Sequence, residues 1–198
     1  MSGIEERIER LLASEHIDTD ELSEVANLLK DAGRFDMLDV LTVRLLQNHG
    51  DDDKVLLLRA WYLTNIECRY EEAADILKTT DSTGDVMYAI LYATITLKTT
   101  FDADMADDIF DNYISYHQDR HSEVALEAAR LFISEQYTDL AEKWISRYEG
   151  VKDNDYMAVY AEILISKEEY PEAAALYGRI IAADPASHDA WNRMVLQG

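Results

Sequence analysis

The chain has 198 residues, of which 48% are hydrophobic, and this is enough apolar material for one folded domain with a sizeable core. Its 40 acidic and 18 basic residues give a net charge of −22, which argues against nucleic acid and against anionic membranes as partners. Pro and Gly number only two and seven, which favours helices joined by short turns over a sheet protein.

The acidity of the chain has three explanations. The first is the solubility of an elongated molecule with a large surface. The second is attraction of a basic partner. The third is adaptation to salt, because Asp outnumbers Glu and Arg outnumbers Lys. Many of the Asp residues, however, stand where helix N-caps are needed, which weakens the third explanation.

The amino-terminal residues are charged and contain no continuous apolar stretch, so we expect no signal peptide. No run of 18 apolar residues occurs in the sequence, so we expect no membrane span and a cytoplasmic location. A helix is predicted over residues 3–14, with Ile4, Ile8, Leu11 and Leu12 on one face. This helix would cover the first helix pair.

Downstream, an aromatic residue recurs at spacings of 35, 31, 36 and 33 residues, a mean of 33.75. These aromatic anchors are Phe35, Tyr70, Phe101, Tyr137 and Tyr170. A small residue precedes each anchor by eight to ten positions, as two closely crossing helices require. The small residues are Ala26, Ala60, Ala93, Ala128 and Ala161. Repeats of this length predict stacked helix pairs that share a continuous core.

The clearest unit lies at residues 156–185. Ala161 and Ala173 flank its aromatic anchor, and Asp184 and Pro185 close it. This unit closely resembles the tetratricopeptide repeat family.

The resemblance implies an all-α fold, a right-handed α-solenoid of about five tetratricopeptide-like helix pairs between two capping helices. We expect one domain over residues 1–198, with an N-terminal cap helix at 3–14 and a C-terminal cap helix at 187–197. The five repeats are expected at about 19–50, 52–82, 84–118, 121–152 and 154–185. Leu38 and Leu140 stand in place of the second small residue in two of them.

Two clusters that suggest metal binding have simpler explanations. His117 and His121 are four residues apart, as in helical zinc sites, but Gln118 stands where a zinc protease needs glutamate. The pair also straddles a predicted turn between repeats. The aspartates from Asp102 to Asp111 lack the glycine of a calcium loop and are typical of the acidic first turn of a helix.

Cys68 is the only cysteine, which excludes an internal disulfide. A nucleophilic role would need a histidine nearby, and none lies in a comparable repeat position. The sequence also contains no glycine-rich phosphate loop. We therefore expect no enzyme activity, no cofactor and no metal.

In the tetratricopeptide family the first helix of each pair lines a concave groove that binds peptides. By this resemblance, the groove residues stand three before, and one, four and five after, the small crossing residue. The expected partner groove contains Asn27, Leu57, Trp61, Asn65, Leu97, Ala129, Phe132, Ile133 and Glu162. Trp61 and Phe132 would anchor an apolar segment there. Packing of Trp61 in the core is the alternative.

Relatives that hold the acidic tails of chaperones use a clamp of lysine, arginine and asparagine, of which only Asn27 is matched here. We therefore expect a protein–protein interaction module or scaffold, chaperone-like in style, that binds a basic or amphipathic segment of a protein partner. The second hypothesis is a structural subunit or homo-oligomer whose apolar surface is permanently covered. Neither hypothesis involves nucleic acid, a membrane or a cofactor.

Overall fold

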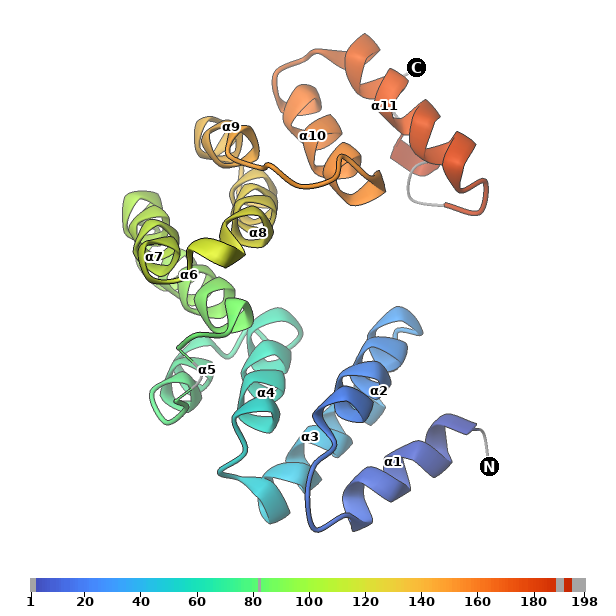
Figure 1. Cartoon of the computed structure of the whole chain (residues 1–198), viewed down its shortest axis with the longest axis vertical. Coiled ribbons are helices and arrows are strands. Elements are labelled where there is room, and N and C mark those ends of the chain that lie inside the picture. The colour runs from blue at the N-terminus through green and yellow to red at the C-terminus, as the bar shows by residue number, and fades with distance from the viewer. Residues whose placement is uncertain (1–2, 82, 188–190, 194–198) are drawn as a thin grey trace. The chain divides into compact units, whose positions relative to one another are not determined.

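The computed structural model describes residues 3–81, 83–187 and 191–193, and these residues form helices and turns without any strand (Figure 1). The helices are α1 (Gly3–Ala13), α2 (Thr19–Asp31), α3 (Phe35–His49), α4 (Asp53–Asn65), α5 (Tyr70–Leu77), α6 (Val86–Thr100), α7 (Ala103–Tyr116), the 3-10 helix η1 (Gln118–Arg120), α8 (His121–Ser134), α9 (Thr138–Ser146), α10 (Asn154–Ser166) and α11 (Tyr170–Ala183). The chain is therefore an all-α helical repeat, as predicted.

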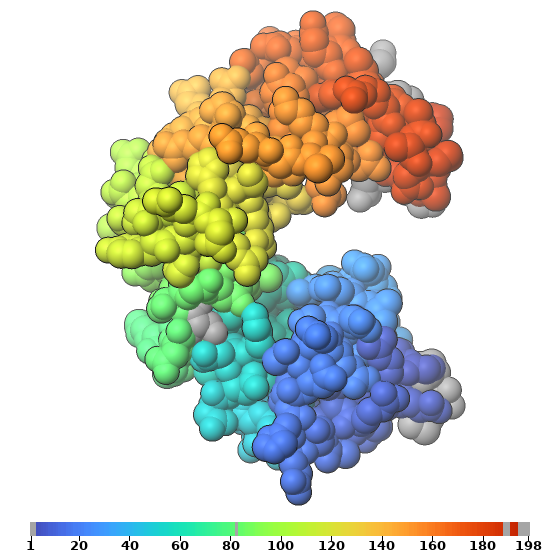
Figure 2. Space-filling view, viewed as in Figure 1, coloured from blue at the N-terminus to red at the C-terminus, as the bar shows by residue number. Residues whose placement is uncertain are grey.

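Two compact units divide the chain after Phe101. The first contains α1 to α6 and the second contains α7 to α11. In the first unit α2 packs against α3 and α4 against α5, and in the second α8 packs against α9 and α10 against α11. Side chains fill the space between neighbouring helices inside each unit (Figure 2). These four pairs fall within the ranges expected for repeats one, two, four and five, whereas α6 and α7 belong to different units.

Aspartates begin most of the first helices of the pairs. The carboxylates of Asp18, Asp52 and Asp153 each accept two backbone N–H groups of the following turn, and that of Asp85 accepts one. These bonds satisfy donors that no helical carbonyl reaches. Helix α8 is the exception, because Arg120 precedes it without a side-chain cap and η1 leads into it.

The small residues predicted at the helix crossings are buried, and each stands eight positions after the residue that precedes its helix. They are Ala26, Ala60, Ala93, Ala128 and Ala161, none of them more than 2% exposed. Four second helices also contain a fully buried alanine. These are Ala73, Ala106, Ala141 and Ala173. Small side chains at both positions let the two helices of a pair approach closely.

A residue in the left-handed backbone region stands two positions before every second helix. These residues are Gly33 (φ 64°), Cys68 (φ 55°), Phe101 (φ 57°), Gln136 (φ 67°) and Glu168 (φ 64°). Three of the turns are Schellman motifs, in which the N–H of Arg34, Tyr137 or Glu169 donates to the carbonyl five residues earlier, at 2.8–2.9 Å. The same turn geometry therefore ends the first helix in different repeats, whether or not glycine is present.

These turns correct two of the predicted aromatic anchors. Phe35, Tyr70 and Tyr170 are the first residues of their second helices, but Tyr137 is the residue before α9 and Phe101 is the left-handed residue itself. Phe101 is also 79% exposed, so it anchors nothing in the first unit. The short spacing of eight residues before Phe101 arises because this aromatic lies two positions too early.

The shift in register also corrects the small residue of α9. Ala141, which is fully buried, occupies the crossing position that the sequence pattern assigned to Leu140. Only Leu38, likewise fully buried, departs from the pattern of small residues on the second helices.

Helix α1 closes the start of the first unit. Its residues Ile8, Leu11 and Leu12 are buried, and the helix contacts both α2 and α3. The predicted C-terminal cap helix over 187–197 lies mostly outside the described residues, of which 191–193 are helical.

Candidate partner-binding site

A pocket of about 230 Å³ opens on the first helices of the first unit. We call it the Trp61 pocket. It is lined by α2, α4 and the start of α6, and by no described residue of α3 or α5. The lining residues are Leu22, Ser23, Ala26, Asn27, Lys30, Lys54, Leu57, Leu58, Trp61, Asp85 and Met87. The pocket therefore lies on the face where the sequence placed a partner groove.

Lys30 lies over the indole ring of Trp61, with its Nζ atom 4.0 Å from the ring centroid. Both side chains are half-buried. No carboxylate of the described residues pairs with Lys30, and its neighbour Asp31 acts only as a nearby charge. Burial lowers the pKa of the Lys30 ammonium below its ordinary value, and Asp31 offsets part of that effect. A cation held this way has capacity left for an anionic group.

The floor of the Trp61 pocket is apolar and its rim is polar. Leu22, Ala26 and Leu57 are each 3% exposed or less, so they present a packed hydrophobic surface. At the rim, the ammonium of Lys54 is paired with the carboxylate of Asp85. The arrangement suits a ligand that has an apolar group beside a polar one.

Position explains why Lys30 is half-buried. It stands twelve residues after its helix N-cap, where the other first helices carry apolar residues or a threonine. Those equivalents are Thr64, Leu97, Phe132 and Ile165. Three of the four are buried, and Ile165 is half-buried. Lys30 is thus a charged residue at a position that faces inward in the other repeats.

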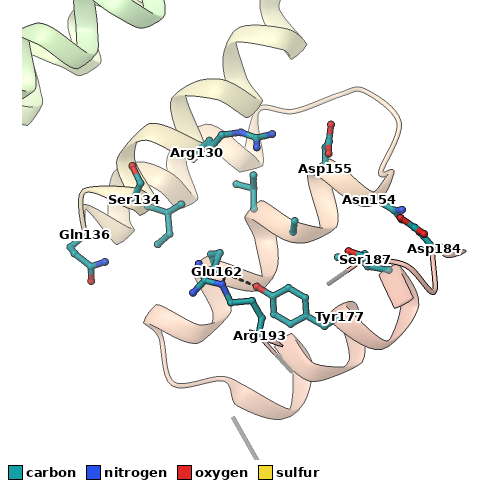
Figure 3. A pocket seen from close by; sticks show the side chains of 14 residues that line it. Arg130, Ser134, Gln136, Asn154, Asp155, Glu162, Tyr177, Asp184, Ser187 and Arg193 are labelled. Carbon is teal, nitrogen blue, oxygen red and sulfur yellow. Dashed lines mark hydrogen bonds and ion pairs between the residues drawn. The ribbon is translucent and has the colours of Figure 1, made fainter. Parts of the chain in front are cut away.

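A second, larger pocket of about 890 Å³ lies in the second unit (Figure 3). We call it the polar pocket. It is lined by Arg130, Ile133, Ser134, Gln136, Asn154, Asp155, Ala158, Val159, Glu162, Tyr177, Ile180, Asp184, Ser187 and Arg193. Ten of the 14 have hydrogen-bonding side chains, and six of these ten lie on α8, α10 or α11.

Glu162 is already satisfied within the polar pocket. Its Oε1 atom accepts a 2.5 Å hydrogen bond from the Tyr177 hydroxyl and forms a 3.2 Å ion pair with Arg193 (Figure 3). Burial, and then the hydrogen bond to Glu162, raise the pKa of Tyr177 above its ordinary value. The remaining amides of Gln136 and Asn154 could pair with the main chain of an extended segment.

Five of the nine predicted groove residues line one of these pockets. They are Asn27, Leu57 and Trp61 in the first unit, and Ile133 and Glu162 in the second. Trp61 lines the pocket and also packs against the buried core. Its side chain therefore has both of the positions considered from the sequence, at the groove and against the core.

The other four predicted residues line neither pocket. Asn65 is exposed, and its amide donates to the Trp61 carbonyl at 2.9 Å. Leu97 is 3% exposed, and Ala129 and Phe132 are fully buried. The Phe132 ring packs edge-on against Phe110, because α8 is surrounded by neighbouring helices of its unit. Phe132 is therefore a core residue, which corrects the expectation that it anchors a ligand.

Several pocket residues were not in the predicted groove. Lys54 lies in the first turn of α4, Asp85 directly precedes α6, and Met87 lies in the first turn of α6. Arg130 and Tyr177 belong to positions that the family-derived spacing did not include. The first three residues lie at helix starts, and Arg130 and Tyr177 lie on helix faces that the spacing did not select. The repeat spacing alone does not identify either kind of position as part of a pocket.

The two suspected metal clusters stay dispersed. His117 follows the end of α7 and His121 begins α8, with η1 between them. Asp102 caps α7 by accepting the N–H of Met105 at 3.0 Å. Among residues 3–81, 83–187 and 191–193, no three His, Cys, Asp or Glu side chains are placed to hold a metal ion.

No protein-family model and no curated protein sequence matches the chain. Its structure, however, is similar to the crystal structure of a thermophilic tetratricopeptide repeat protein from Thermus thermophilus. The TM-score is 0.68 at 17% sequence identity, over 88% of this chain and 95% of that one. The chain therefore has the tetratricopeptide-like fold that its repeat pattern predicted. Within the described part of the chain, no helix has the length and apolar character needed to cross a bilayer.

Proposed function

We propose that this protein is a protein-interaction scaffold that binds a segment of a partner protein in the Trp61 pocket. An apolar side chain of the partner would lie on Leu57 and Trp61, and an adjacent acidic group would pair with Lys30. Helical-repeat folds of this kind offer extended binding surfaces, which supports a binding role in general.

One observation carries the proposal, namely the half-buried ammonium of Lys30 over Trp61 without a carboxylate partner in the described chain. In a chain of net charge −22, carboxylates are abundant, yet among the described residues none pairs with Lys30, and Asp85 of the same pocket pairs with Lys54. A partner carboxylate would supply the missing charge in a partly desolvated site, where such pairs are stronger than in water.

The size of the pocket favours a small part of a polypeptide. Its volume of about 230 Å³ lies below the range of about 300–1,000 Å³ typical of small-molecule sites. One or two side chains would fill it. The proposed partner chemistry at this pocket differs from the basic segment expected from net charge, because Lys30 adds a positive charge beside the mutually neutralised pair of Lys54 and Asp85.

Selection from a random peptide library tests the proposal without a known partner. Library peptides would be selected on the immobilised wild-type chain and on the Lys30→Met variant. We expect the wild type to enrich an apolar residue next to Asp or Glu, and the variant to lose the acidic preference. Enrichment of basic peptides, or identical selections on both chains, would contradict the proposal.

Affinity measurements on a selected peptide then separate the contributions. Lys30→Met and Trp61→Ala should each weaken binding about tenfold or more, the size typical of central interface residues. The control is Lys78→Met, since Lys78 directly follows α5, its side chain is 73% exposed and it lies outside the pocket. If this control weakens binding as much as Lys30→Met, the effect is one of overall charge and not of the pocket.

A further inference from the structure

A separate groove lies between α1 and α3 in the first unit. Its volume is about 300 Å³. The lining residues are Glu5, Ile8, Glu9, Leu12, Asp36, Met37, Val40, Leu41 and Arg44. None of them belongs to the Trp61 pocket. The groove is therefore a second surface, formed by the capping helix and the second helix of the first pair.

Apolar side chains from both helices form the floor and walls of this groove. Ile8 and Leu12 are one helical turn apart on α1 and are each 8% exposed, and Leu41 of α3 is fully buried. Val40, in contrast, is 55% exposed. A packed apolar floor beside the exposed side chain of Val40 suits the apolar face of an amphipathic helix.

Comparison with the other second helices shows that the apolar wall is specific to α3. Val40 stands seven residues after the left-handed turn residue. Val43, which is 38% exposed and lies outside the groove lining, stands ten residues after it. The residues equivalent to Val40 are Asp75, Asp108, Lys143 and Ala175. Those equivalent to Val43 are Lys78, Asp111, Ser146 and Gly178. Both positions carry large apolar residues only in α3, so the repeat pattern does not account for them.

Charges around the groove are mostly acidic. Glu5, Glu9 and Asp36 line it, and Arg44 is the one basic residue among the described residues of its lining. Arg44 and Glu9 form a 3.7 Å ion pair in which both side chains are at least half exposed. The hydrogen bond from Arg34 lowers the pKa of Asp36, so its carboxylate is ionised at neutral pH. Arg34 and Asp36 also form a 3.4 Å ion pair, so the three carboxylates exceed the two arginines beside the groove by one charge. This excess, in a chain of net charge −22, favours the approach of a basic segment, because exposed rim charges steer association.

We propose that the α1–α3 groove docks an amphipathic helix of a partner protein that carries lysine and arginine beside its apolar face. Apolar side chains of that helix lie between Ile8 and Val40, and its basic residues face Glu9 and Asp36. A second copy of this chain is a poor occupant, because two chains of charge −22 repel each other. The proposal is independent of ligand binding in the Trp61 pocket.

The test uses the full chain and three labelled peptides of about 18 residues, or about five helical turns. The first has leucines on one face and lysine and arginine on the other. The second has glutamate at each basic position, and the third is a scrambled version of the first. We expect the first peptide to bind at least tenfold more tightly than the others, with an affinity that falls as salt rises. Equal binding of the basic and acidic peptides would overturn the proposal.

Variants of the protein locate the site. Val40→Asp introduces the residue that α5 and α7 carry at the same position, and it should weaken binding of the basic peptide at least tenfold. Leu28→Asp is the matched control, because Leu28 is 46% exposed on α2 and lines neither the groove nor the Trp61 pocket. Lys30→Met should also leave this affinity unchanged, which separates the proposal from the function of the Trp61 pocket. Binding unchanged by Val40→Asp would overturn the assignment.

Two further experiments test whether a loss of peptide binding by Val40→Asp has a cause other than damage to the groove. Circular dichroism melts verify that Val40→Asp remains folded, and Glu9→Gln with Asp36→Asn serves as a second test that leaves the apolar floor intact. That double variant should reduce both the affinity and its salt dependence. If sedimentation shows instead that the wild-type chain dimerises and that Val40→Asp makes it monomeric, the occupant is a second copy and the proposal fails.

Discussion

Gly33 and Glu168 share a backbone φ of 64°, and each stands two residues before the second helix of its pair. Only the first of the two is the residue that this conformation favours. An added Cβ at Gly33 would meet no atom within 4 Å, so backbone conformation alone decides the effect of a substitution there.

Gly33→Ala should therefore lower the free energy of unfolding by about 1 kcal/mol. Gly178→Ala is the matched control, since Gly178 lies inside α11, has a normal φ and also has space for a Cβ. That variant should raise the free energy of unfolding by about 0.5–1 kcal/mol, because alanine is the better helix former. Urea melts of both variants measure the two changes in the free energy of unfolding. If both changes had the same sign, the left-handed turn assigned at Gly33 would be contradicted.

The repeat length and the crossing alanines could be read from the sequence, but the register of individual turns could not. Aromatic residues were used as markers of the second helices, and Phe101 and Tyr137 lie one or two positions away from the equivalent site. The left-handed residues mark the turns better, yet only Gly33 among them is a glycine. A side chain with a Cβ at such a position leaves no signature in the composition of the turn.

Burial on the first helices was likewise only partly predictable. Spacing placed Trp61 and Phe132 on the same face, but one is half-buried and the other fully buried. The two residues stand at different positions of the repeat, nine and twelve residues after the one that precedes the helix, and Thr64, the α4 equivalent of Phe132, is buried too. The spacing rule grouped both positions on one face and did not separate the more buried one. The spacing also placed Lys30, four residues after Ala26, on the groove face. It did not show that the Lys30 ammonium is half-buried over the Trp61 ring.

Phe132→Ala should lower the free energy of unfolding by about 3–5 kcal/mol, the usual cost of deleting a buried aromatic ring. Trp61→Ala should cost clearly less, because part of its ring faces the pocket and not the core. Thermal and urea melts of the two variants compare them directly. A larger loss for Trp61→Ala would show that Trp61 is primarily a core residue.

Thr64→Val should raise the free energy of unfolding by about 1 kcal/mol, because the Thr64 hydroxyl is buried without a hydrogen-bond partner among the described residues. Thr42→Val provides the contrast. The Thr42 hydroxyl is also buried, but it donates to the Asp39 carbonyl at 3.1 Å and accepts from Arg59 at 3.2 Å. Thr42→Val should therefore lower the free energy of unfolding. Urea denaturation of both variants tests whether the two changes in this free energy have opposite signs.

Ala161→Leu should lower the free energy of unfolding by about 1–3 kcal/mol, as overpacking of a close helix crossing usually does. Ala161 and Ala173 are both fully buried within one core cluster of the second unit. Ala175→Leu, at an exposed position of α11, should be nearly neutral. Calorimetry on both variants would show whether the space at the crossing is as limited as the structure indicates.

Lys30→Met should stabilise the protein at neutral pH while it weakens the proposed ligand binding. Burial lowers the pKa of Lys30, so the unfolded chain binds the proton more tightly than the folded chain. The penalty is fully present below the folded-state pKa and disappears as pH rises through the ordinary value of 10.5. The stability difference between wild type and variant should therefore shrink as pH rises to that value. A constant difference across urea melts at neutral and alkaline pH would contradict the role of Lys30 burial.

The aspartates that begin helices bear on the acidic composition of the chain. The chain contains 22 aspartates and 18 glutamates, an imbalance that in other contexts is a sign of a saline habitat. Five of the aspartates accept backbone N–H groups at the starts of α2, α4, α6, α7 and α10. Aspartate is preferred in that role because its short side chain reaches the first turn. With these five set aside, 17 aspartates remain, one fewer than the glutamates. The excess of aspartate over glutamate in this chain therefore matches its demand for helix N-caps, without any need for adaptation to salt.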